Sequence, residues 1–133
     1  MLEFIQNMVI LIFLYVTSFL LHELFHVKSQ GLKSTGTIYV DKLGMTASSN
    51  HIHDYELFKM SGGILTSIIF FLMVFVTDNF MQWGFLTFGF LHFCYGLFEW
   101  KYLGILPPQK YKARRYSIYV WVILIMIVIW LVK

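Results

Sequence analysis

The chain alternates between long apolar stretches and short polar segments, and this alternation predicts helices that cross a membrane. A helix needs about 20 residues to span a hydrocarbon core. We predict such helices over residues 4–27, 59–77, 80–100 and 116–132. The last stretch is apolar on every side and has Tyr116 and Trp130 near its ends, where aromatic side chains favour the membrane surface. We interpret it as an anchor without a chemical role.

The polar segment between the first two predicted helices has a different pattern. Residues 36–49, GTIYVDKLGMTASS, form two short β-prone runs around a glycine-containing turn, which predicts a β-hairpin. A soluble connector is the alternative. The sequence therefore predicts one domain over residues 1–133, an all-α integral membrane protein of about four transmembrane helices with a small β-hairpin in the first loop.

Composition supports a single membrane-embedded unit. The chain is 59% hydrophobic and 20% aromatic, which is too apolar for an ordinary soluble domain. We divide it into a three-helix core with the hairpin, residues 1–104, and a linker with the anchor, residues 105–133, because Pro107 and Pro108 mark the exit from the third helix. Cys94 is the only cysteine, which excludes an intramolecular disulfide and a cysteine-based zinc cage. The N-terminus has no basic segment and no small-residue cleavage site, so we expect the first helix to remain in the mature protein.

Charge predicts the orientation of the helices. The formal net charge is +3, and nine of the ten basic residues belong to or border the first and third loops: Lys28, Lys33, Lys42, Lys59, Lys101, Lys110, Lys112, Arg114 and Arg115. Basic loops face the cytoplasm, which places both termini and the turn at residues 77–79 outside. We expect a multi-pass protein, in the cell membrane if the source is prokaryotic. No basic stripe with interleaved aromatic residues is present, so the expected partner is a lipid bilayer and not a nucleic acid.

Two histidines and a glutamate end the first predicted helix in the sequence HELFH. His22 and His26 are four residues apart, which places their Cβ atoms about 6 Å apart on one helical face, as two ligands of one zinc ion require. Glu23 is displaced around the helix and can reach a zinc-bound water, and this is the HExxH pattern of zinc hydrolases. The alternative is a set of interfacial polar residues satisfied by water and headgroups. Three ionisable groups without a metal would then have no compensating interaction.

Two histidines leave zinc one protein ligand short of the usual three. Counted from the flanking lysines at about 1.5 Å per residue, Glu99 and His26 lie at the same depth near the cytoplasmic boundary, so we favour Glu99 as the third ligand. An interfacial carboxylate is the alternative for Glu99. His92 shares a helical face with Glu99, about one turn deeper than His22, and is a candidate ligand or transition-state hydrogen-bond donor. The remaining candidates are the loop residues His51, His53, Asp54 and Glu56.

In these motifs the chain resembles the site-2 protease family of intramembrane zinc metalloproteases. That family has HExxH on its first core helix, a Gly-Pro-x-x-Asn-like stretch on its second and Leu-Asp-Gly on its third. Here HELFH matches in full, and SGGILTS resembles the second motif, with Gly62-Gly63 in place of Gly-Pro and Thr66 at the Asn position. LFEW resembles the third motif, with Glu99 where Asp would be. The likeness covers residues 9–100 in order and orientation, in a distant and minimal form.

The zinc motif and the resemblance together imply an intramembrane metalloprotease. Zinc would activate a water, Glu23 would act as general base, and peptide bonds of transmembrane or membrane-associated peptides would be cut near the cytoplasmic face. The edge of the predicted hairpin could hold an extended substrate by strand addition. A non-catalytic metal-binding or metal-transporting membrane protein is the alternative, although it gives Glu23 no task. A di-iron membrane hydroxylase would need more than the five histidines present. A homo-oligomer or a regulatory membrane partner is compatible with either function.

Overall fold

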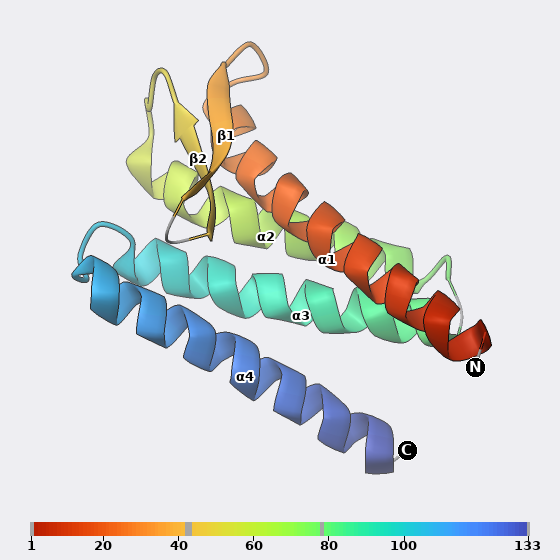
Figure 1. The fold of residues 1–133 in the computed structure, drawn as a ribbon. Helices are drawn as coiled ribbons and strands as arrows, with labels where there is room; N and C mark the ends of the chain where they lie inside the picture. Colours follow the sequence, from red (N-terminus) through yellow and green to blue (C-terminus); the bar gives the residue numbers. More distant parts are fainter. Residues whose placement is uncertain (1, 42–43, 78, 133) are drawn as a thin grey trace.

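The computed structural model describes residues 2–41, 44–77 and 79–132. It contains, in chain order, α1 (Leu2–Lys28), β1 (Gly36–Asp41), β2 (Gly44–Ser49), α2 (Tyr55–Val74), α3 (Asn79–Tyr102) and α4 (Pro108–Val132). The prediction of four helices and a hairpin is confirmed over the described residues (Figure 1). Lys42 and Asp78, which enter the predictions on charge and on the turn at 77–79, lie outside the described residues, as does the side chain of Trp130.

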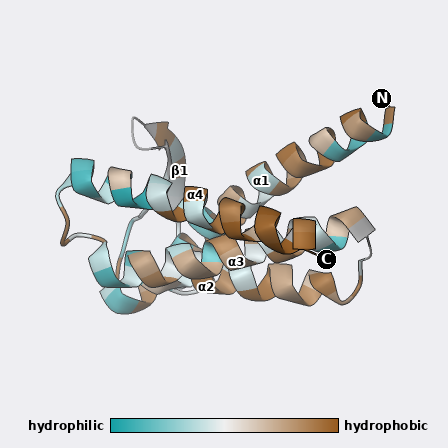
Figure 2. Cartoon of the chain, turned by 90° about the horizontal axis from the view of Figure 1, so that it is seen from below, coloured by the Kyte–Doolittle hydropathy of each residue, from teal (hydrophilic) through white to brown (hydrophobic). Residues whose placement is uncertain are grey.

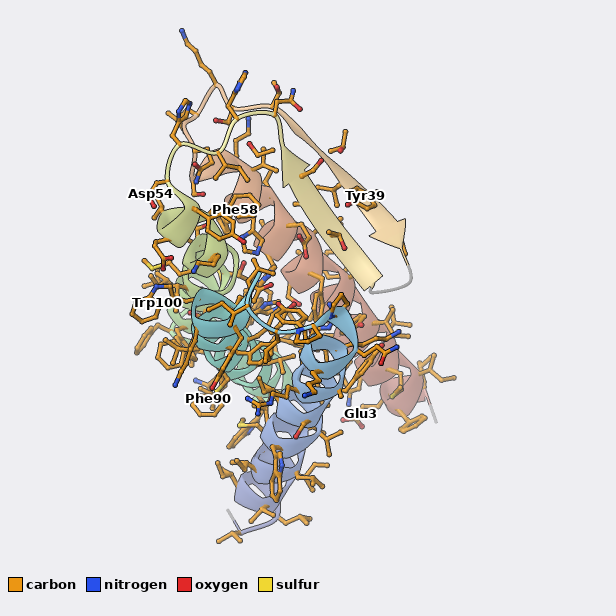
Figure 3. The ribbon with its side chains drawn as sticks, turned by 90° about the vertical axis from the view of Figure 1, so that its left-hand side faces the viewer. Glu3, Tyr39, Asp54, Phe58, Phe90 and Trp100 are labelled. Carbon is orange, nitrogen blue, oxygen red and sulfur yellow. The ribbon has the colours of Figure 1, made fainter. Side chains whose placement is uncertain are left out.

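Helices α2 and α4 begin at least one helical turn earlier than predicted, for local reasons. Helix α2 begins at Tyr55 instead of residue 59, because the Asp54 carboxylate accepts a hydrogen bond of 2.9 Å from the Leu57 N–H and caps the helix. Figure 3 shows Asp54 and Phe58 at this start of α2. Helix α4 begins at Pro108 instead of residue 116. Proline suits the first helical position, where an N–H would have no intrahelical partner. The polar residues interpreted as a linker therefore form the first turns of α4.

Helices α2 and α3 are antiparallel and meet with their backbones in contact (Figure 1). A Cβ atom on Gly63 would lie 2.3 Å from the Gly96 Cα atom, so this close approach requires glycine on both helices. Buried apolar side chains join α1 to this pair: Leu14, Phe70 and Phe85. A second cluster joins α3 to α4: Leu91, Val122 and Met126. The glycine contact thus fixes α2 against α3, and α1 and α4 pack around them.

The hairpin lies against the last turns of α1 at one end of the molecule. Its strands pair antiparallel, with Gly36 opposite Ser49 and Asp41 opposite Gly44. A Cβ atom on Gly36 would lie 3.0 Å from Val27 Cγ2, which shows how closely β1 approaches α1. The connection between α3 and α4 lies at the same end (Figure 1), so most of the loops gather around the end of α1 that carries HELFH.

Apolar side chains cover much of the outer surface of the described residues. Figure 2 shows hydrophilic residues gathered at the hairpin end and hydrophobic residues over the remainder of the helices. Two helices, α1 and α2, are long and apolar enough to cross a membrane. Helix α4 also exposes large apolar side chains along its length, including Trp121 at 63% and Val128 at 59%. The fold therefore contains the predicted elements, and two of the four predicted spans meet the criterion of length and composition over the described residues.

Candidate metal centre

His22 and His26 lie on the buried stripe of α1, one turn apart and with Ser18 one turn before them. Their exposed fractions are 0% and 3%, whereas many apolar residues of the same helix are exposed. The helix thus buries two ionisable rings and exposes apolar side chains, which is the reverse of the pattern usual in soluble proteins. Burial of ionisable groups in this way indicates that they have a function.

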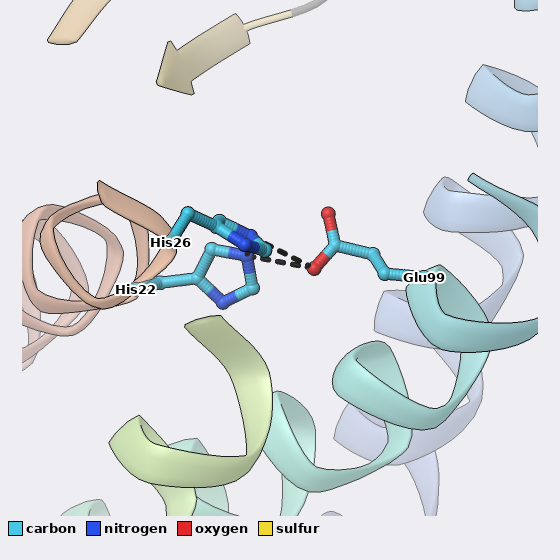
Figure 4. Close-up of side chains that lie close together, drawn as sticks. All are labelled: His22, His26 and Glu99. Atoms are coloured by element: carbon cyan, nitrogen blue, oxygen red, sulfur yellow. Dashed lines mark hydrogen bonds and ion pairs between the residues drawn. The ribbon is translucent and has the colours of Figure 1, made fainter. Parts of the chain in front are cut away.

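Glu99 comes from α3 and completes a group of three donor atoms. Its Oε2 atom lies 2.9 Å from His22 Nε2 and 3.3 Å from His26 Nε2, and the two Nε2 atoms are 3.0 Å apart. Figure 4 shows both rings facing the carboxylate across the gap between α1 and α3. The three residues that the sequence suggested as ligands therefore lie together, and they form a buried group that could hold a metal ion.

The distances between the donor atoms fit a single metal ion. Donors about 2.0–2.1 Å from a tetrahedral ion are separated from one another by about 3.3 Å, and the edge of an octahedral site is about 3.0 Å. The observed separations run from 2.9 to 3.3 Å. The donor set of two imidazoles and a carboxylate is used by zinc hydrolases and by ferrous oxygenases alike, so the identity of the ion has to come from the surrounding groups.

Hydrogen bonds orient the rings and the carboxylate. His26 Nδ1 donates to the Phe58 carbonyl oxygen, which leaves the lone pair of its Nε2 atom directed toward Glu99. The Tyr111 hydroxyl donates to the other oxygen of Glu99, Oε1, at 3.2 Å. These contacts leave Glu99 Oε2 as the oxygen that faces the two histidines.

Glu23 borders a cavity that opens beside the donor group. The cavity has a volume of about 130 Å³ and is lined by four elements: Glu23 and His26 of α1, Thr46 and Ala47 of β2, Tyr95, Glu99 and Leu103 near α3, and Tyr111 and Arg115 of α4. Glu23 is 6% exposed, and the Ala47 backbone hydrogen-bonds to its carboxylate. A buried carboxylate thus stands next to the candidate metal ligands in a space that a small group can enter.

The polar residues of α4 are the part of the site that sequence analysis missed. Tyr111 and Arg115 fall in the segment interpreted as a linker, yet they are four residues apart on a helix and both line the cavity. Arg115 also contacts the Tyr95 hydroxyl at 3.5 Å. Extending the predicted helix back to Pro108 would have placed these two side chains on one face.

Small residues of SGGILTS lie directly against a candidate ligand. A Cβ atom on Gly62 would lie 2.4 Å from His26 Nε2 and 2.7 Å from the His22 carbonyl oxygen. Ser61 donates to the Phe58 carbonyl at 3.1 Å, and Thr66 is fully buried. The second stretch therefore borders the site, although Gly63 serves the contact with α3.

The loop candidates lie elsewhere. Asp54 caps α2, and Glu56 pairs with Lys59 at 2.6 Å and accepts from the Trp100 indole at 2.9 Å. His51 and His53 line a separate surface pocket of about 280 Å³. None of these four joins the buried donor group within the described residues. His92 is fully buried beside His22 and does not line the cavity.

Comparisons with protein-family models, with curated proteins and with solved structures found no match for this chain. The resemblance to the site-2 protease family therefore stays a prediction from the sequence motifs.

Proposed function

We propose that this chain is a membrane-embedded zinc metalloprotease that hydrolyses peptide bonds of transmembrane or membrane-associated peptides. One observation carries the proposal: the donor atoms of His22, His26 and Glu99 converge within 3.3 Å beside the buried carboxylate of Glu23. The three residues alone would suit several metals and functions. Glu23 favours zinc hydrolysis, because a carboxylate adjacent to two histidine ligands is positioned for proton transfer and not for ligation.

Each residue around the cavity has a separate role in the proposed reaction. His22, His26 and Glu99 would hold the ion, which when bound would supply a Lewis acid and a water of lowered pKa. Glu23 accepts the proton of the attacking water and returns it to the leaving amine. The guanidinium of Arg115 faces the same cavity and can stabilise negative charge that develops on the peptide oxygen.

The edge of β2 away from β1 is a place where an extended substrate could bind. Ala47 pairs with Ile38 of β1, yet its backbone bonds to the carboxylate of Glu23, so the edge that β1 does not occupy faces the cavity. A peptide that pairs with this edge would bring its carbonyl groups to Glu23. A transmembrane substrate must unwind locally before it can bind in this way.

The membrane arrangement is part of the proposal. We infer four spans, with the hairpin and the α3–α4 connection in the cytoplasm, since the basic residues gather there. The metal ligands near the C-terminal end of α1 and the last turns of α3 would then lie close to the cytoplasmic surface, where water can enter.

The proposal is tested with Glu23→Gln in the full chain. We expect this variant to bind one zinc per chain, as the unaltered protein does, and to lose cleavage of membrane peptides. Glu3→Gln is the matched control, because it makes the same chemical change on α1 at an exposed position far from the site (Figure 3). It should retain both zinc and cleavage.

Three results would contradict the proposal. Absence of stoichiometric zinc from the unaltered protein removes the metal centre. Loss of zinc from Glu23→Gln shows that Glu23 is a ligand and not the base. Zinc binding without cleavage of any membrane peptide by the unaltered protein favours the alternative, a metal-binding or metal-transporting membrane protein.

A further inference from the structure

His92 lies behind His22, on the side of the ring that faces away from Glu99. Its Nδ1 atom is 3.1 Å from His22 Nδ1, whereas His22 Nε2 is 2.9 Å from Glu99 Oε2. His92 is 0% exposed, and aromatic rings enclose it, with the Phe19 ring centroid 4.9 Å away. It therefore reaches the candidate metal centre only through His22.

A histidine that binds a metal through Nε2 carries its hydrogen on Nδ1, and a buried N–H needs an acceptor. For His26 that acceptor is the Phe58 carbonyl. The atom that faces the Nδ1 atom of His22 is Nδ1 of His92, and a neutral imidazole can accept there when its own hydrogen is on Nε2, an atom that is buried without a hydrogen-bond partner among the described residues. The two candidate ligands thus have one acceptor each, from α2 and from α3.

We infer that His92 is a positioning residue that accepts a hydrogen bond from His22 Nδ1 and so holds the His22 ring with its Nε2 lone pair toward the metal. This inference rests on the proposed metal centre and assigns His92 a place outside the cavity. It differs from the role of ligand or transition-state donor expected from the sequence, because His92 does not line the space that a substrate would enter.

Two variants of His92 distinguish the effect of its hydrogen bond with His22 from the effect of its packing. His92→Leu fills much of the space but has no acceptor, whereas His92→Asn carries an amide oxygen near the position of the original Nδ1 atom. Loss of such a partner typically weakens metal binding by about 10- to 100-fold. We expect His92→Leu to lose zinc affinity by this factor and His92→Asn to recover most of it.

Zinc affinity is measured on the full chain in detergent or vesicles, by competition with a chromophoric chelator. The visible absorption spectrum of the cobalt-substituted protein reports the geometry of the ligands and should shift in His92→Leu. Ser67→Ala is the matched control, because Ser67 is also buried but donates within its own helix, to the Ile64 carbonyl at 2.7 Å. It should leave the affinity and the spectrum unchanged.

The outcomes distinguish this inference from the proposed function. If the unaltered protein binds no zinc, the metal centre itself fails. If it binds zinc and His92→Leu binds equally tightly, the metal centre stands and the role of His92 is wrong. If His92→Leu does not fold, as judged by helix content, His92→Asn decides alone: affinity near that of the unaltered protein supports the inference, and a loss of 10-fold or more overturns it.

Discussion

Replacing Gly62 with alanine should remove metal binding by displacing His26. The added Cβ atom would stand 2.4 Å from His26 Nε2, and an ordinary van der Waals contact begins at 3.4 Å, so the ring has to move by 3.4 − 2.4 = 1.0 Å. Metal–ligand distances are maintained within about 0.2 Å in working sites. The alternative is movement of α2 away from α1, which would also relieve the contact of the same Cβ atom with the His22 carbonyl oxygen at 2.7 Å, but it would separate His26 Nδ1 from the Phe58 carbonyl oxygen that orients the ring.

The expected result follows from this displacement. One of three protein ligands leaves its position, so zinc affinity should fall by at least 100-fold, while overpacking costs about 1–3 kcal/mol of folding stability. Gly84→Ala is the matched control, because its Cβ atom would meet only the flexible end of Leu14, Cδ1, at 2.6 Å. The assay is chelator competition for zinc, with thermal unfolding of the metal-free protein as a measure of stability. Zinc affinity of Gly62→Ala within a few fold of that of Gly84→Ala would refute the reasoning.

Three other predictions test the remaining groups. Glu99→Ala should lower zinc affinity as much as the loss of a histidine does, whereas Glu99→Asp should have a milder effect because it retains the oxygen donors. Equal zinc affinities for Glu99→Ala and the unaltered protein would show that Glu99 is not a ligand. Arg115→Met should leave zinc binding unchanged and lower kcat for peptide cleavage by about 10²- to 10³-fold, and Arg115→Lys should recover part of this loss. An effect on KM alone would mean that Arg115 binds substrate without stabilising charge. A cysteine placed at Lys110 should react with impermeant reagents from the cytoplasmic side, and labelling only from the outside would invert the proposed orientation.

The pattern of apolar stretches and turn residues was sufficient to predict the elements but not their ends. Long apolar stretches predict helices well because the backbone of a segment expected to span a membrane must form its hydrogen bonds internally. The start of α4 was missed because its first turns are polar, and a pattern based on apolarity ignores a proline that suits a helix start. The same error hid Tyr111 and Arg115, which the structure brings to the cavity.

Depth along the helices predicted part of the site and could not predict the rest. Glu99 and His26 were expected at the same depth along the helices, and Glu99 Oε2 lies 3.3 Å from His26 Nε2. His92 was expected about one helical turn deeper than His22, and in the structure the Nδ1 atoms of the two rings are 3.1 Å apart. Depth says nothing about rotation around a helix axis, however. The side of the His22 ring on which His92 lies could therefore be learned only from the packing of α3 in the structure. Likewise, the spacing of residues along the chain could not predict the path of the loop that carries His51 and His53.

The backbone contact between Gly63 and Gly96 has a consequence for how the protein holds together. Glu99 follows Gly96 by less than one helical turn, so this ligand is rigidly attached to the α2–α3 pair, whereas His22 and His26 both belong to α1. An ion bound to all three residues would therefore be a removable cross-link between α1 and the α2–α3 pair, in addition to the apolar contacts of Leu14 with Phe70 and Phe85. Binding energy at such a link adds to the stability of the assembled helices by mass action. Withdrawal of such a metal would remove one connection between α1, together with the hairpin that lies on it, and the rest of the bundle.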